Sequence, residues 1–124
     1  MSANPFQERF QHMLAASLVD QDTIEQTIAL IKTVEQELGL ALTEENGGAF
    51  AGHCALAIQR LRDGNYETEK SQDADEIVSE YPKLHALSRK VLSPYLRPES
   101  AEAVEREAAL ITLYLVAMTD DSDD

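Results

Sequence analysis

The sequence predicts an all-α protein built as a compact bundle of about five helices. Three observations favour this fold class. Apolar residues recur at helical spacing along most of the chain, no stretch shows the strict alternation of a half-buried strand, and 124 residues suit one hydrophobic core. We expect an N-terminal helix packed on the bundle, then the helical domain, then a disordered acidic tail, over residues 1–20, 21–119 and 120–124 respectively.

The first two predicted helices precede Gly39. The first is amphipathic, is expected to end near Val19, and places Arg9 on its solvent-exposed side. Its apolar stripe consists of Phe6, Phe10, Met13, Leu14 and Leu18. The second begins at Asp22, because an N-cap residue followed three positions later by Glu25 forms a capping box, and Gly39 supplies its C-terminal stop.

The third predicted helix begins after Thr43, whose hydroxyl can cap it, and runs to Arg62. Gly47 and Gly48 lie in its first turns, where each costs about 1 kcal/mol relative to alanine. We therefore expect the start of this helix to be frayed or bent. A polar loop is expected to follow it.

Two further helical stretches complete the predicted bundle. Helix resumes over about 73–92 with a break at Pro82, and the last helix spans about 99–118. On that last helix Leu113 and Val116 project from the side opposite the main apolar stripe. A helix that is apolar on two sides must be covered on both, either by a central position in the bundle or by a subunit interface. We expect a homodimer paired through such a surface.

Composition and charge exclude several classes of function. Ten Lys and Arg stand against 23 Asp and Glu, and the net charge of −13 disfavours direct binding to nucleic acid. Cys54 is the only cysteine and the three histidines are scattered, so we expect no disulfide, no metal site and no cofactor. Neither a signal peptide nor a membrane span is evident, which makes the cytoplasm the expected location and a membrane partner unexpected.

The segment around His53 is the most informative for function. On a helical wheel this residue lies about a quarter-turn from the centre of an apolar face, and Arg60 returns to nearly the same angle two turns later. That face consists of Phe50, Cys54, Ile58 and Leu61. An imidazole with a reference pKa of about 6.5 is largely neutral, hence nucleophilic, at cellular pH. The alternative is a structural histidine at the edge of the core. His12 and His85 are expected to be exposed.

These residues and two later segments resemble a known family, the PTS regulation domains found in antiterminators and activators of sugar operons. His53 with the Ala-Leu-Ala-Ile-Gln-Arg run that ends at Arg60 is similar to the family's first phosphorylation motif. The segment Asp75–Pro82 resembles its Glu-Ile and Tyr-Pro segment, and Glu107–Val116 resembles its last helix. The resemblance covers about residues 21–119 in the right order.

The resemblance implies a five-helix, commonly dimeric bundle that takes phosphate from the phosphocarrier HPr or an enzyme II component. It makes His53 the phosphoacceptor and Arg60 a phosphate-stabilising residue. Tyr114 occupies the second acceptor position and is degenerate there, because a tyrosine cannot replace histidine in this transfer. Gly52 stands where the family often has an acid. The chain lacks the nucleic-acid-binding region usually joined to such modules, so we expect a stand-alone member that acts on an unidentified regulatory protein.

The sequence thus predicts a regulatory protein of the sugar phosphotransferase system and not an enzyme. It accepts phosphate on a single histidine and signals through protein–protein contacts. The alternative is a constitutive helical dimer or interaction module that has lost phosphotransfer, which Tyr114 and Gly52 favour. A small metabolic enzyme acting at a helical cleft ranks last, because no catalytic constellation supports it.

Overall fold

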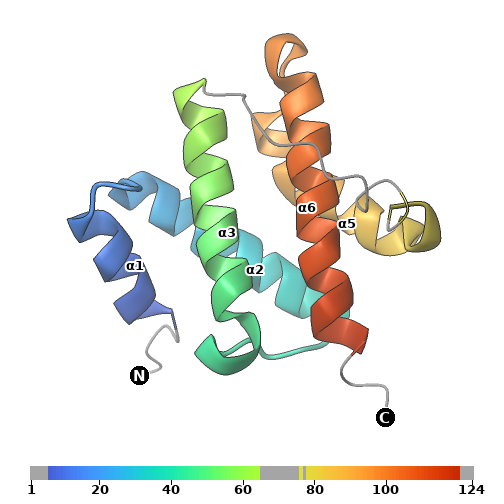
Figure 1. The fold of residues 1–124 in the computed structure, drawn as a ribbon, viewed down its shortest axis with the longest axis horizontal. Helices are drawn as coiled ribbons and strands as arrows, with labels where there is room; N and C mark the ends of the chain where they lie inside the picture. Colours follow the sequence, from blue (N-terminus) through green and yellow to red (C-terminus); the bar gives the residue numbers. More distant parts are fainter. Residues whose placement is uncertain (1–5, 65–75, 77, 121–124) are drawn as a thin grey trace. The chain divides into compact units, whose positions relative to one another are not determined.

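The computed structural model describes residues 6–64, 76 and 78–120, and every regular element in them is a helix (Figure 1). The all-α prediction is therefore confirmed. The elements are α1 (Gln7–Ala15), α2 (Gln21–Leu38), α3 (Glu44–Asp63), α5 (Pro82–Leu92), the 3₁₀ turns η1 (Ser93–Tyr95) and η2 (Pro98–Ser100), and α6 (Ala101–Asp120). They form two compact units, residues 1–59 and 60–124.

The first helix is shorter than its apolar spacing predicts. It ends at Ala15, not near Val19, because Ser17 adopts a left-handed backbone conformation with φ of 60°. The Leu18 amide then donates to the Met13 carbonyl at 2.9 Å, which closes the end of the helix. As a result Leu18, expected in the apolar stripe, is 51% exposed.

The N-cap of the second helix lies two residues earlier than predicted. Asp20, not Asp22, is the N-cap, and its Oδ1 accepts a hydrogen bond from the Thr23 amide at 2.8 Å. Gln59 of α3 reinforces this start, since its Oε1 accepts from the Asp20 amide and from the Thr23 hydroxyl. The predicted stop is confirmed, because Gly39 caps the C-terminus in the left-handed region with φ of 67°.

The corrected cap leads to a direct test. We expect Asp20→Ala to lower the free energy of unfolding by about 1 kcal/mol, because it removes the acceptor for the Thr23 amide. The matched control is Asp22→Ala, which replaces another acid of the same turn without removing the cap. Urea unfolding of both variants checks the assignment. A larger loss for Asp22→Ala would show that the capping box begins there after all.

The helix α3 begins at Glu44 and continues without a break through Gly47 and Gly48, so the predicted fraying is not observed. The predicted Thr43 cap is confirmed: its Oγ1 accepts from the Asn46 amide, and Asn46 Oδ1 accepts from the Thr43 amide at 2.7 Å. Gly48 is buried, and a Cβ atom on it would lie 2.8 Å from Arg9 Nη2. The glycine therefore leaves room for the ends of the Arg9 and Glu44 side chains, which a Cβ atom would displace.

The second unit is organised around α5 and α6, which pack along each other. Pro82 occupies the first turn of α5, where its missing N–H is tolerated. The helix break expected at this proline is therefore the N-terminus of α5. Ser88 and Thr112 are both fully buried, and the Thr112 hydroxyl lies 3.0 Å from Ser88 Oγ. In the helix predicted before Pro82, residues 76 and 78–80 are helical. The described residues do not include 65–75, 77 and 121–124, which hold the predicted loop, the start of that helix and most of the predicted tail.

Candidate functional site

The apolar face that the helical wheel predicts for α3, next to His53, is confirmed. The four residues predicted to centre its apolar face are all buried. They are Phe50, Cys54, Ile58 and Leu61, with exposed fractions of 1%, 0%, 0% and 6%. His53 is partly buried, and its Nε2 atom has less than 1 Å² of accessible surface. The imidazole thus lies at the edge of the core, with one ring nitrogen covered.

Arg9 of α1 lies on α3 at the residue before this histidine. A Cβ atom on Gly52 would sit 3.4 Å from Arg9 Nη1, so the arginine covers the position where the resemblance implies an acid. Arg9 Nε donates to Glu44 Oε1 at 2.9 Å, and this hydrogen bond lowers the pKa of the Glu44 carboxyl. The helical pattern of residues 6–18 predicts Arg9 on the solvent side of α1 and does not indicate this contact. The signal was the glycines of α3, which let another element approach.

Arg60 forms a buried ion pair in the second unit. Its Nε and Nη2 atoms donate to Glu107 Oε2 at 3.0 and 2.8 Å. The Glu107 side chain is fully buried, whereas that of Arg60 is 30% exposed. A charge-assisted contact of this kind fixes the guanidinium against α6. The predicted phosphate-stabilising residue therefore already holds a carboxylate, at a position that sequence spacing did not indicate.

Tyr114, at the second acceptor position of the resemblance, lies on α6 and is partly buried. Two neighbours on the helix, Ile111 and Leu115, are fully buried. This burial pattern is typical of a ring packed at the edge of a core. The fully buried Cys54 is likewise consistent with a small core residue.

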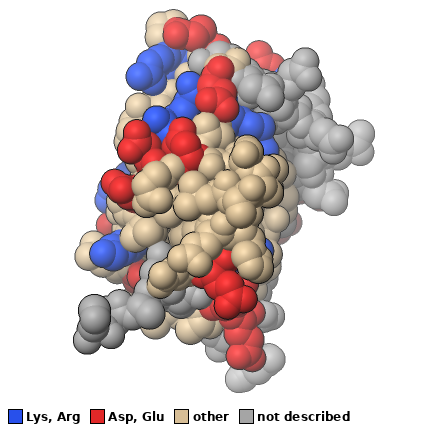
Figure 2. Space-filling view, turned by 90° about the vertical axis from the view of Figure 1, so that its left-hand side faces the viewer, with Lys and Arg blue, Asp and Glu red and all other residues tan. Residues whose placement is uncertain are grey.

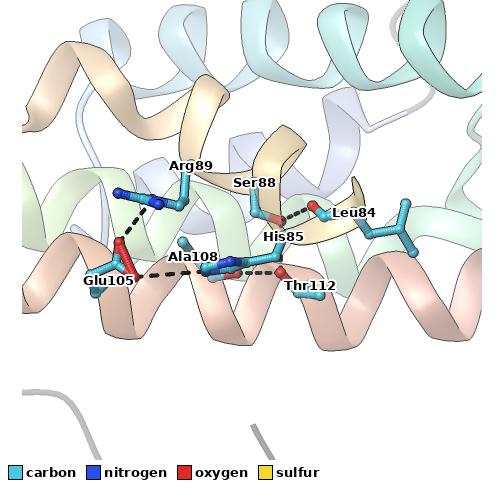
Figure 3. Close-up of polar contacts among 7 residues, drawn as sticks. All are labelled: Leu84, His85, Ser88, Arg89, Glu105, Ala108 and Thr112. Carbon is cyan, nitrogen blue, oxygen red and sulfur yellow. Dashed lines mark hydrogen bonds and ion pairs between the residues drawn. The ribbon is translucent and has the colours of Figure 1, made fainter. Parts of the chain in front are cut away.

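The other histidines differ in environment. His12 on α1 is exposed, as expected. The expectation that His85 is exposed is wrong: its side chain is 16% exposed, and its Nε2 lies 3.7 Å from Glu105 Oε1 on α6. Arg89 Nε is 2.9 Å from the other oxygen of the same carboxylate (Figure 3). The packing of α5 along α6 covers this ring, which the local sequence pattern does not reveal.

The surface carries charges of both signs. Figure 2 shows Lys and Arg side chains lying beside Asp and Glu on one face of the molecule. Within residues 6–64, 76 and 78–120, no helix combines the length and apolar character needed to cross a membrane. Across that described part, no three or more His, Cys, Asp or Glu side chains are grouped so that they could hold a metal ion.

Fold and candidate site together define an all-helical domain with a histidine at the edge of its core. Residues 28–118 match the PRD domain, so the chain belongs to the PRD domain family. The match begins inside α2 and ends two residues before the end of α6, and it leaves α1 outside. No curated protein and no solved structure matches the chain.

Membership of this family settles the general class of function. PRD domains are regulatory domains of the phosphotransferase system, are phosphorylated on histidines and interact with components of that system. Their role is regulatory and not catalytic. The matched segment includes His53, Arg60 and Tyr114, the three positions that the sequence singled out.

Proposed function

We propose that this protein is a phosphorylation-responsive regulator of the sugar phosphotransferase system, with His53 as its phosphoacceptor. The observation that carries the proposal is the position of this histidine, partly buried on α3 beside a fully buried face and inside the family segment 28–118. A neutral imidazole is the nucleophile, and the phosphoryl group it receives adds close to two negative charges. HPr or an enzyme II component is the donor.

The covered Nε2 atom favours coupling between phosphate transfer and a change in conformation. With less than 1 Å² of accessible surface, this atom cannot meet the phosphoryl group of a donor protein until the packing around the ring opens. Adding a doubly charged group to a partly buried position then disfavours the original packing. The two packings of the domain are the states that a partner protein distinguishes.

Arg60 is the proposed phosphate-stabilising residue. It follows His53 by two turns of α3, on nearly the same side of the helix, and side chains on a helix lean toward its N-terminus, the end at which His53 lies. A guanidinium has five N–H donors, and the hydrogen bonds to Glu107 use those of Nε and Nη2. The remaining donors can hold a phosphoryl oxygen by a charge-assisted hydrogen bond.

The output of the regulator is a protein–protein contact in the cytoplasm, made by a homodimer with an unidentified regulatory protein. A net charge of −13 disfavours direct binding to nucleic acid. The contacts of Arg9 with the glycines and Glu44 of α3 support stable packing of α1 on this helix. The segment 1–20 is then an N-terminal addition to the helical domain, which extends over 21–119. Four of the last five residues of the sequence, 120–124, are aspartates.

The proposal predicts acid-labile phosphate on His53. The purified protein is incubated with enzyme I, HPr and labelled phosphoenolpyruvate, then digested with trypsin at alkaline pH. His12, His53 and His85 fall in separate peptides, residues 10–32, 33–60 and 84–89. We expect label in peptide 33–60, its loss in His53→Ala, and its retention in His12→Ala, the control at an exposed histidine.

Absence of label from peptide 33–60 of the wild type would contradict the assignment of His53. Equal labelling of that peptide in His53→Ala would contradict it as well. Circular dichroism of the variants establishes that the helices are retained, so that a loss of label reports on the acceptor.

A constitutive interaction module is the second candidate, and Tyr114 at the second acceptor position favours it. Such a module binds its partner whether or not His53 carries phosphate. The discriminating experiment compares His53→Gln with the wild type, with and without active phosphotransferase components, by co-purification of partners and by sedimentation equilibrium. Partner binding or assembly that changes with phosphorylation in the wild type alone would exclude this candidate.

A further inference from the structure

The family-matched segment contains one histidine besides His53. The chain has three histidines, and His12 precedes the segment 28–118. The remaining one is His85 on α5. Because PRD domains are phosphorylated on histidines and the second acceptor position here is Tyr114, His85 is the other place in this segment where that chemistry is available.

The surroundings of His85 suit a nucleophilic imidazole. Its Nε2 lies 3.7 Å from Glu105 Oε1, and Arg89 holds the other carboxylate oxygen, with Nε 2.9 Å from Oε2 (Figure 3). A carboxylate beside one ring nitrogen favours the tautomer that carries the proton there. In that tautomer the lone pair is on Nδ1. The ring is 16% exposed, which leaves an edge for a donor to approach.

The two helices beneath this cluster are held in register. The Ser88 hydroxyl donates to the Leu84 carbonyl at 3.0 Å, and the Thr112 hydroxyl lies 3.0 Å from Ser88 Oγ and 2.8 Å from the Ala108 carbonyl. Ser88 and Thr112 are fully buried. A site built on two helices locked in this way keeps its side chains in place without help from a loop.

We propose that His85 is a second phosphoacceptor, positioned by Glu105; this inference rests on the proposed function of the protein as a phosphotransferase-system regulator. The Nδ1 lone pair of His85 forms a bond to the phosphorus of a phosphohistidine donor. The donor's N–P bond breaks, and its electron pair returns to the donor ring, which leaves as a neutral imidazole. The proton on Nε2 stays in place, and Glu105 balances the positive charge of the phosphorylated ring.

Arg89 supplies the charge that receives the phosphoryl group. It lies one turn after His85 on the same face of α5, and both residues meet the same Glu105 carboxylate. Its side chain is 59% exposed, so the guanidinium can reorient at little cost. Phosphorylation would bring this guanidinium onto the phosphoryl oxygens and weaken its hold on Glu105 of α6. The second acceptor therefore acts on the packing of α5 against α6.

The test is the labelling experiment above, read at peptide 84–89. We expect label there in the wild type and in His53→Ala, and none in His85→Ala or in the more conservative His85→Gln. Label in peptide 33–60 without label in 84–89 would overturn this inference and leave the assignment of His53 intact. Label in 84–89 alone would support it and contradict His53, and label in neither would overturn both.

The role of Glu105 has its own readout. We expect Glu105→Gln to slow labelling of peptide 84–89 on the order of tenfold, as loss of a group that orients a histidine does. Labelling of peptide 33–60 should be unchanged. Nuclear magnetic resonance of the wild type should show phosphate on Nδ1, whereas Glu105→Gln should give a mixture of the two ring isomers. An unchanged isomer and rate in Glu105→Gln would overturn the positioning role.

Discussion

We expect Arg60→Met to lower the free energy of unfolding by about 3–5 kcal/mol, among the largest effects that one substitution can have in this protein. The variant removes the guanidinium that holds Glu107 Oε2 at 2.8 and 3.0 Å. The Glu107 side chain is fully buried, so its charge loses its counter-ion where water cannot replace it. The total stability of a small domain is about 5–15 kcal/mol, so this loss is a large part of it.

A matched surface pair provides the control. Arg106 and Glu102 form an ion pair within α6, and the Glu102 side chain is 79% exposed. Arg106→Met should therefore cost about 0.5 kcal/mol or less. Replacing both partners of the buried pair, as Arg60→Met with Glu107→Leu, should recover most of the lost stability. Urea unfolding measures all three, and equal losses for Arg60→Met and Arg106→Met would show that burial of Glu107 does not matter.

We expect a comparably large loss, about 2–5 kcal/mol, from Leu115→Ala on α6. Leu115 is fully buried, so its truncation removes apolar contacts and leaves a cavity. Leu113 lies two residues earlier on the same helix and is partly buried. Leu113→Ala makes the same chemical change and should cost only about 1 kcal/mol.

The comparison is made by urea unfolding, and the change in helix propensity cancels because both variants replace leucine by alanine in one helix. Sedimentation equilibrium on the same samples adds a second reading, since Leu113 belongs to the apolar side proposed for the dimer interface. Loss of assembly in Leu113→Ala alone would support that role. A larger loss of stability for Leu113→Ala than for Leu115→Ala would contradict the observed burial.

Periodicity predicted the inner face of α3 well, because a helix repeats its direction at a fixed interval along the chain. Phe50, Cys54 and Ile58 are buried, and His53 lies at the edge of that face, as the wheel indicates. The end of α2 at Gly39 could also be predicted from the sequence, because the C-cap residue adopts a left-handed conformation, which glycine favours.

Local patterns failed where several residues offer the same signal. Asp20 and Asp22 both suit an N-cap, and the choice depends on Gln59, which anchors the start of α2 from another helix. Helical spacing continued to Leu18, but Ser17 turns the chain out of the helix. Neither outcome follows from composition or spacing within the segment itself.

The amino-acid sequence by itself determined the all-helical class, the family, the buried side of α3 and the candidate phosphoacceptor, because these depend on periodicity and on motifs short enough to read along the chain. Only the tertiary structure decided that Arg60 holds Glu107, that Arg9 lies on the glycines of α3, and that Glu105 and Arg89 surround His85. Those pairs join residues far apart in sequence. Side chains of opposite charge attract only where packing of the helices brings them together, and no local pattern specifies that distance.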